Sequence, residues 1–132
     1  SGILHDSGKV YLPKDILDKL TSLDPIEFES VKQHPRKSYE VSKELGIHKV
    51  QILNAILHHH EKLDGTGYPD ELVGYEIPLL SQILSVCDIF DALTTDRTYR
   101  PHFTTYDALK IMKTDMHHQL NEQYVNNLIA LL

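Results

Sequence analysis

The stretch HHHEKLDGTGYP, residues 58–69, carries the strongest indication of fold and chemistry in this chain of 132 residues. Just before it, Val50, Leu53, Ile56 and Leu57 recur at helical spacing and predict a helix that leads into the histidines. The glycines and the proline that follow predict a loop. The histidines stand in the middle of the chain, whereas expression tags stand at the termini.

The adjacent histidines His59 and His60 are unusual for a helix that simply packs. Successive helical residues point about 100° apart. Two neighbouring imidazoles therefore suit a single packing face poorly, but they can each reach one of two adjacent metal ions. A solvated helix end is the alternative interpretation of the same residues.

Towards the N-terminus the sequence predicts further helices. Asp24-Pro25-Ile26-Glu27 combines an N-cap, a first-turn proline and a capping-box glutamate. That helix is expected to run to about His34, because Pro35 disfavours helical geometry at the residue before it. A further helix from Arg36 is expected to end at Gly46 in a left-handed cap.

Towards the C-terminus, Pro78 opens an apolar helix that lacks a wide polar face and is expected to be central. Two more helices are predicted, one capped near Thr104 or Thr105 and one capped by Asn121. No segment alternates with a period of two. We therefore predict an all-α helical bundle that forms one domain over residues 1–132.

Composition limits the possible functions. The apolar and charged fractions, 41% and 24%, are ordinary for a globular protein, and the net charge of −6 argues against duplex DNA or bulk RNA as ligand. No apolar run is long enough to span a bilayer. The only cysteine, Cys87, excludes an internal disulfide and indicates a reducing cytoplasm. Nine histidines favour metal binding.

Spacing connects the histidines to other candidate ligands. Alone, His5-Asp6 would more often be a helix-end pair without metal. Asp88 lies inside the apolar helix, where an unpaired carboxylate would cost several kcal/mol, and it fits a metal ligand and a structural role equally well. Four stations nevertheless follow one another at intervals of about one helical hairpin, as in the metal sites of helical bundles. The stations are His5-Asp6, His34, His59-His60 and Asp88.

The predicted ligands are imidazoles and carboxylates without a thiolate. Such a set suits iron, manganese, nickel or zinc. Cys87 is expected to be only a buried neighbour of Asp88.

Four ordered motifs carry a resemblance to a known family. Residues 5–9, HDSGK, are similar to the HD-x-G-K signature of the HD phosphohydrolase superfamily. Residues 59–69 resemble the HHExxDGxGYP element that names the HD-GYP family. Residues 85–94 resemble its VADxFDALT helix, and residues 96–100 match its DRxYR motif. Together they extend over about three quarters of the chain.

This resemblance implies an HD-domain-like bundle that hydrolyses the bacterial messenger cyclic di-GMP. Two or three divalent metal ions are expected, most often iron, with Mn, Ni or Zn as alternatives. Asp6 would bridge metals, and a hydroxide held between them would attack phosphorus to give pGpG, with GMP after a second cut. The implied metal ligands are His5, Asp6, His34, His59, His60 and Asp88.

The resemblance also implies roles for residues around the metals. Lys9 and Asp91 would join Asp6 in the catalytic set, and both would contact the substrate. Arg97 and Arg100 would bind its phosphates or guanines, and Tyr68 would rest against it.

Glu61 is not implied as a metal ligand and is expected to orient a ligand histidine. The Gly67-Tyr68-Pro69 loop would dock GGDEF-domain proteins, and homodimer formation is left open. The remaining histidines are interpreted as surface residues or as neighbours of the site; they are His48, His58, His102, His117 and His118.

Two departures from the family pattern qualify these expectations. Family members take at least one metal ligand from a helix before the HD pair, and residues 1–4 read like the last turn of such a helix, so the domain is expected to be N-terminally incomplete. At residues 116–122 the chain has MHHQLNE where the family often has a GTHFDP-like turn.

Three alternatives to the enzyme are considered. A weakly active or inactive cyclic di-GMP receptor is disfavoured because every ligand position present is intact. An HD hydrolase of dNTPs or ppGpp would lack the doubled histidine and the GYP element. A purely structural helical domain would leave Asp88 and the four stations unexplained.

Overall fold

The computed structural model describes residues 2–96 and 101–132, and over these residues it confirms the all-α prediction. Its only β-type pairing in the described residues is an isolated bridge between Asp64 and Val73. No helix there is long and apolar enough to cross a bilayer. In chain order the elements are η1 (Ser7–Tyr11), α1 (Lys14–Leu17), α2 (Pro25–Val31), α3 (His34–Glu44), α4 (Val50–Leu57), η2 (Gly74–Glu76), α5 (Leu79–Thr94), α6 (Thr105–Thr114) and α7 (Glu122–Leu131).

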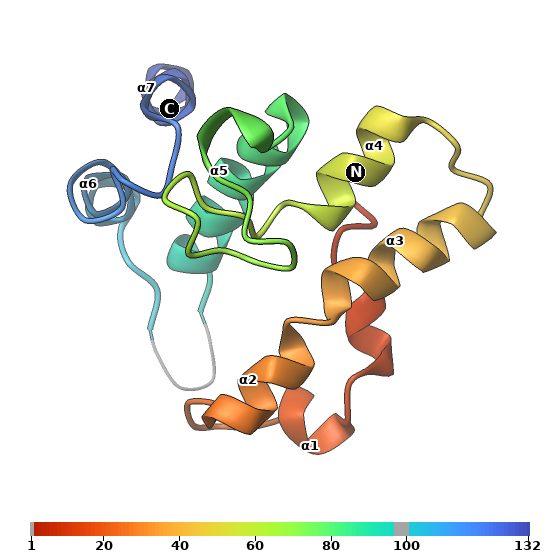
Figure 1. The fold of residues 1–132 in the computed structure, drawn as a ribbon. Coiled ribbons are helices and arrows are strands. Elements are labelled where there is room, and N and C mark those ends of the chain that lie inside the picture. Colours follow the sequence, from red (N-terminus) through yellow and green to blue (C-terminus); the bar gives the residue numbers. More distant parts are fainter. Residues whose placement is uncertain (1, 97–100) are drawn as a thin grey trace.

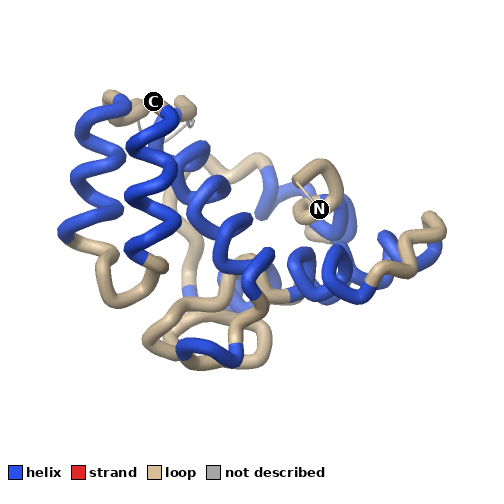
Figure 2. Tube along the Cα trace, turned by 90° about the horizontal axis from the view of Figure 1, so that it is seen from above, coloured by secondary structure: helices blue, strands red, loops and turns tan. Residues whose placement is uncertain are grey.

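Helix α5 is central, as the sequence predicts. It contacts α4 on one side and α6 and α7 on the other, while α3 packs against both η1 and α4 (Figure 1). The helices α6 and α7 contact each other, and Figure 2 shows this C-terminal pair lying side by side. The long loop between α4 and α5, green in Figure 1, lies beside α5.

A compact apolar core joins α5 to the C-terminal pair. Val86 of α5 is buried together with Met112, Leu120 and Val125. Removing one such side chain from water contributes about 1.5–3 kcal/mol. This core fixes the position of α5, the helix that also carries Asp88.

The predicted helix ends are largely confirmed. Asp24 and Glu27 form a complete capping box at α2. Thr104 caps α6 and Asn121 caps α7 through their side chains. Gly46 follows α3 with a φ of +87°, the left-handed conformation that glycine adopts without steric cost.

The predicted boundary near His34 is wrong. Helix α2 ends at Val31, and His34 begins α3 with Pro35 in its first turn. A first-turn residue needs no N–H donor within the helix, so the proline starts this helix instead of ending the previous one.

Two further expectations are corrected. Helix α4 ends at Leu57, so His59 and His60 lie in the turn that follows it, and the helical angle between them does not apply. Cys87 is exposed on α5 and is not a buried neighbour of Asp88.

Candidate metal centre

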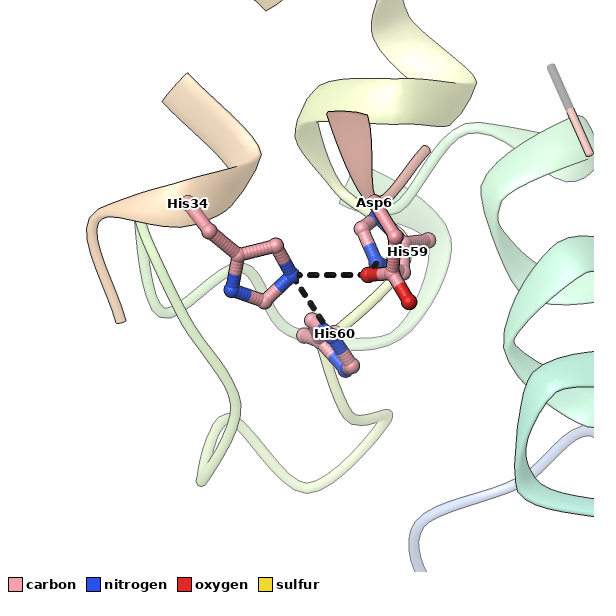
Figure 3. Close-up of side chains that lie close together, drawn as sticks. All are labelled: Asp6, His34, His59 and His60. Atoms are coloured by element: carbon pink, nitrogen blue, oxygen red, sulfur yellow. Dashed lines mark hydrogen bonds and ion pairs between the residues drawn. The ribbon is translucent and has the colours of Figure 1, made fainter. Parts of the chain in front are cut away.

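The six side chains that the sequence predicts as metal ligands meet at one place. Ligand atoms of Asp6, His34, His59 and His60 all lie within 4.8 Å of one another, and Figure 3 shows this group. A second group, under the same limit, consists of His5, His59 and Asp88. The two groups share His59 and together form what we call the ligand cluster.

Each ligand stands at or near the end of an element, except for Asp88. Asp6 is the N-cap of η1 and follows His5, while His34 is the first residue of α3. The turn after α4 supplies both adjacent histidines. Asp88 comes from the interior of α5, which the apolar core holds in place. The stations predicted from spacing therefore do converge.

Three of the histidines are oriented in the same way. In each, Nδ1–H donates to the carbonyl oxygen of the residue three positions earlier, which directs Nε2 towards the other members of the cluster. Fixing one ring nitrogen in this way is typical of histidines that bind metal through the other. The pairs are His5 with Gly2 at 2.8 Å, His34 with Val31 at 2.7 Å and His59 with Ile56 at 2.6 Å.

The Nε2 atoms of these histidines lie close to other possible ligand atoms. His34 Nε2 is 3.2 Å from Asp6 Oδ1 and 3.2 Å from His60 Nε2. Asp6 Oδ1 and His59 Nε2 are buried without a hydrogen-bond partner. Buried lone pairs that face one another are unfavourable unless a proton or a metal ion lies between them. Imidazole and carboxylate donors are the kind that divalent transition metals take, so the cluster fits divalent metal ions.

Asp6 faces both groups of the cluster. Its Oδ1 lies towards His34 and is 4.0 Å from His59 Nε2, while its Oδ2 is 3.5 Å from His5 Nε2. Oδ2 also accepts a hydrogen bond from Lys9 Nζ at 2.7 Å. Burial would raise the pKa of Asp6, but the contacts with His34 and Lys9 outweigh burial and lower it. The carboxylate is therefore ionised at neutral pH.

The adjacent histidines are neutral at neutral pH. Burial lowers the pKa of His59 to about 4. Burial, and then the neighbouring His59, lower the pKa of His60 as well. Neutral imidazole is the form that binds metals. In the second group His5 Nε2 contacts Asp88 Oδ1 at 3.2 Å, and this bond raises the pKa of His5.

Two of the predicted substrate contacts border the cluster. Lys9 reaches it through Asp6, and its side chain is partly open to solvent. The ring of Tyr68 stacks on that of His60, with centroids 4.9 Å apart and an interplanar angle of 28°. Burial raises the pKa of Tyr68, so its phenol stays protonated and can donate a hydrogen bond.

The other predicted contacts are not brought to the cluster in the described residues. Asp91 is exposed on α5, and its carboxylate accepts a bond from Thr95 Oγ1 at 3.4 Å. Arg97 and Arg100 lie outside the described residues. Their predicted roles stay predictions.

The expectation that Glu61 orients a ligand histidine is wrong. Its carboxylate is buried and accepts hydrogen bonds from the backbone N–H groups of Asp70, at 2.7 Å, and Leu72, at 3.1 Å. It thereby fixes the glycine-rich loop that carries Tyr68. His58, expected at the surface or beside the site, is buried next to Glu61, with Nδ1 3.7 Å from Oε1.

Close contact between η1 and α3 was not anticipated from the sequence. The backbone N–H of Gly8 donates to Ser38 Oγ at 2.8 Å, and both residues are buried. This contact positions Asp6 and Lys9 over the start of α3. The glycine of the HDSGK motif is a signal of such close approach.

We predict that Gly8→Ala destabilises the domain. The added methyl carbon would lie 2.3 Å from the backbone oxygen of His34 and 2.5 Å from the backbone nitrogen of Ser38, so the backbone must shift. Overpacking of this kind costs about 1–3 kcal/mol, measurable by urea denaturation. Gly2→Ala is the control, because nothing lies within 4 Å of its added carbon. An unchanged urea midpoint in Gly8→Ala would contradict the prediction.

A bundle in which histidines and aspartates from separate helices converge on one point belongs to the class of metal-binding helical domains. Residues 1–122 match the model of the HD domain family, and the chain belongs to that family. Its fold is similar to that of Bd1817, an HDG"Y"P protein from Bdellovibrio bacteriovorus, with a TM-score of 0.75 and 23% identity over 98% of this chain and 40% of that one.

Curated relatives agree with the HD-GYP motifs. Cyclic di-GMP phosphodiesterase PA4108 of Pseudomonas aeruginosa is 38% identical over 85% of this chain and 27% of its own length. The cyclic di-GMP phosphodiesterase response regulator RpfG of Xanthomonas campestris pv. campestris is 43% identical over 80% and 28%. The 3'3'-cGAMP-specific phosphodiesterase 3 of Vibrio cholerae is 40% identical over 89% and 25%.

The chain thus spans about a quarter of the length of these relatives. The resemblance to HD-GYP proteins that the motifs indicate is confirmed.

Proposed function

We propose that residues 1–132 form the catalytic domain of a metal-dependent phosphodiesterase that hydrolyses cyclic di-GMP. The products would be pGpG and, after a second cut, GMP. The main observation in support of this proposal is that the two ligand groups share His59 and are joined by the carboxylate of Asp6. The names of two of the relatives support cyclic di-GMP as the substrate.

The proposed ligands divide into two sets. Asp6, His34 and His60 would hold one ion, His5 and Asp88 would hold another, and His59 would serve one of them. Iron is the proposed metal, with Mn, Ni or Zn as alternatives of the same donor preference. When bound, such ions lower the pKa of a coordinated water and neutralise charge on phosphoryl oxygens.

The chain's own residues would hold and orient the substrate. Lys9 can donate to a phosphate oxygen while it keeps Asp6 ionised and in place. The protonated phenol of Tyr68 can donate a hydrogen bond beside His60. Asp91, Arg97 and Arg100 are proposed as further contacts on the ground of the motifs alone.

Partners and setting complete the proposal. Docking of a GGDEF-domain protein at the Gly67-Tyr68-Pro69 loop is proposed on the ground of the motif alone. A reducing cytoplasm fits the free, exposed thiol of Cys87. Homodimer formation is a separate question for sedimentation analysis.

The function is tested by loading the protein with Fe(II) under low oxygen, counting metals by elemental analysis and incubating it with cyclic di-GMP. We expect two or more metal equivalents and formation of pGpG. Chelation should abolish turnover, and added Fe(II) should restore it. Stoichiometric metal without pGpG or GMP would favour the receptor instead, and full turnover after chelation would contradict metal dependence.

A further inference from the structure

A cavity of about 520 Å³ lies next to the ligand cluster, bounded by η1, α1, the connection between α1 and α2, and α2. We call it the α1–α2 cavity. Its volume falls within the range of small-ligand sites, about 300–1,000 Å³. Most of its wall is apolar, with Phe28 as its aromatic side chain. Its polar side chains are Lys9, Lys19, Thr21 and Ser22.

Two routes connect this cavity to the ligand cluster. Lys9 lines the cavity and donates to Asp6 at 2.7 Å. On the other route Phe28 lines the cavity and meets the ring of Tyr68 edge to face, with centroids 6.1 Å apart. Tyr68 in turn stacks on His60. A molecule whose phosphate lies at the cluster could therefore extend directly into the cavity.

The lining suits a purine nucleoside. The ring of Phe28 is partly exposed and lines the cavity. Lys32 Nζ lies over this ring, 5.1 Å from its centroid, so a planar base would stack on the ring face opposite Lys32. The exposed hydroxyls of Thr21 and Ser22 make no hydrogen bond with any of the described residues and can pair with the polar edge of a base. Lys19 is held by an ion pair with Glu27. Lys9 contacts Asp6 and is therefore the cavity lysine that lies at the ligand cluster.

The relatives indicate why a base-binding site is needed. Proteins of similar identity to this chain are named for cyclic di-GMP in two cases and for 3'3'-cGAMP in another. These cyclic dinucleotides have the same phosphodiester backbone and differ in one purine base. Metal ions held by the cluster would contact the phosphate, which is the same in both molecules, so residues outside the ligand cluster must distinguish the bases.

We propose that the α1–α2 cavity binds one purine base of the cyclic dinucleotide, with Phe28 stacking on it and Thr21 and Ser22 reading its edge. This inference rests on the proposed function and adds the residues that set its base preference.

The first test compares Phe28→Ala with Ile26→Ala, an exposed apolar control on the same helix that does not line the cavity. Cyclic di-GMP and bis(p-nitrophenyl) phosphate, a diester without a purine, are the two substrates. In Phe28→Ala the loss of kcat/KM for cyclic di-GMP should exceed the loss for the chromogenic diester by ~10-fold, mainly through KM. Phe28→Tyr should restore most of it. Equal losses on both substrates would overturn the inference and leave the proposed function standing.

The second test concerns base preference. The double variant Thr21→Val/Ser22→Ala should change the ratio of kcat/KM for cyclic di-GMP and 3'3'-cGAMP by ~5-fold or more, because it removes hydrogen bonds that only one base completes. An unchanged ratio would contradict the assignment of these two hydroxyls.

A binding measurement separates the inference from the proposed function. GMP is titrated into the isotope-labelled protein while amide shifts are followed by NMR. Shifts at Thr21, Ser22 and Phe28 that disappear in Phe28→Ala would support the cavity even if the metal-loaded protein cleaved no cyclic dinucleotide, a result that would sink the proposed function alone. No shifts at these residues would overturn the cavity assignment.

Discussion

His59→Ala is expected to lose bound metal and turnover together while the helical fold persists. His59 belongs to both ligand groups, and its free Nε2 is fully buried without a hydrogen-bond partner. No other described side chain is common to the two groups. Because metal stabilisation of a phosphoryl-transfer step amounts to several kcal/mol, kcat should fall by ~1,000-fold or more. Elemental analysis, product formation and circular dichroism measure the three consequences.

The chain supplies a matched control for this prediction. His117-His118 is a second pair of adjacent histidines, exposed after α6 and outside every potential ligand group in the described residues. His118→Ala should keep its metal content and turnover. His59→Gln, which leaves a smaller void than alanine, guards against a loss caused only by cavity formation. Unchanged turnover in His59→Ala would exclude the ligand cluster as the catalytic site.

Much of the fold was predictable because its signals are local. The capping box of Asp24 and Glu27, the caps Thr104 and Asn121 and the left-handed Gly46 each depend on residues within one turn. The boundary at His34 was not predictable in this way. Pro35 is compatible with either a helix end or a helix start, and packing of α3 on η1 decides between them.

The convergence of the site was predictable for a different reason. In a bundle each helical hairpin returns the chain to the same level, so evenly spaced polar residues meet there. This holds even when the local conformation predicted for a residue is wrong. The prediction placed His59 and His60 in a helix, yet the turn after α4 brings them to the same point.

The details that complete the site depend on tertiary contacts. The close approach of Gly8 to α3 arises only when these separate segments pack. The anchoring of the loop by Glu61 depends on backbone groups nine and eleven residues away. A single sequence also carries no periodic signal for the α1–α2 cavity, because its lining comes from η1, two short helices and the irregular connection between those helices.

The variant Asp6→Asn tests whether the negative charge of Asp6, and not only the size of its side chain, is needed at the proposed bridging position. The amide has nearly the same size as the carboxylate, but it lacks the negative charge that lies between His34 on one side and His5 on the other. We expect at least one metal equivalent to be lost and kcat to fall by ~1,000-fold, with an unchanged circular dichroism spectrum. Asp15→Asn, at an exposed position in the first turn of α1, is the control. Full metal content together with wild-type turnover would contradict a bridging role for Asp6.

The same variant has a consequence that does not require metal. In the metal-free protein the pKa of Asp6 is lowered: burial opposes this, but the contacts with His34 and Lys9 prevail. A carboxyl group with a lowered folded-state pKa stabilises the fold above its ordinary pKa, and that contribution is lost as the pH falls towards the lowered value. The difference in unfolding free energy between wild type and Asp6→Asn should therefore be largest near neutral pH and shrink below about pH 4, where a free aspartate takes up its proton. A difference that grows as the pH falls would mean that His34 and Lys9 do not stabilise the ionised form of Asp6.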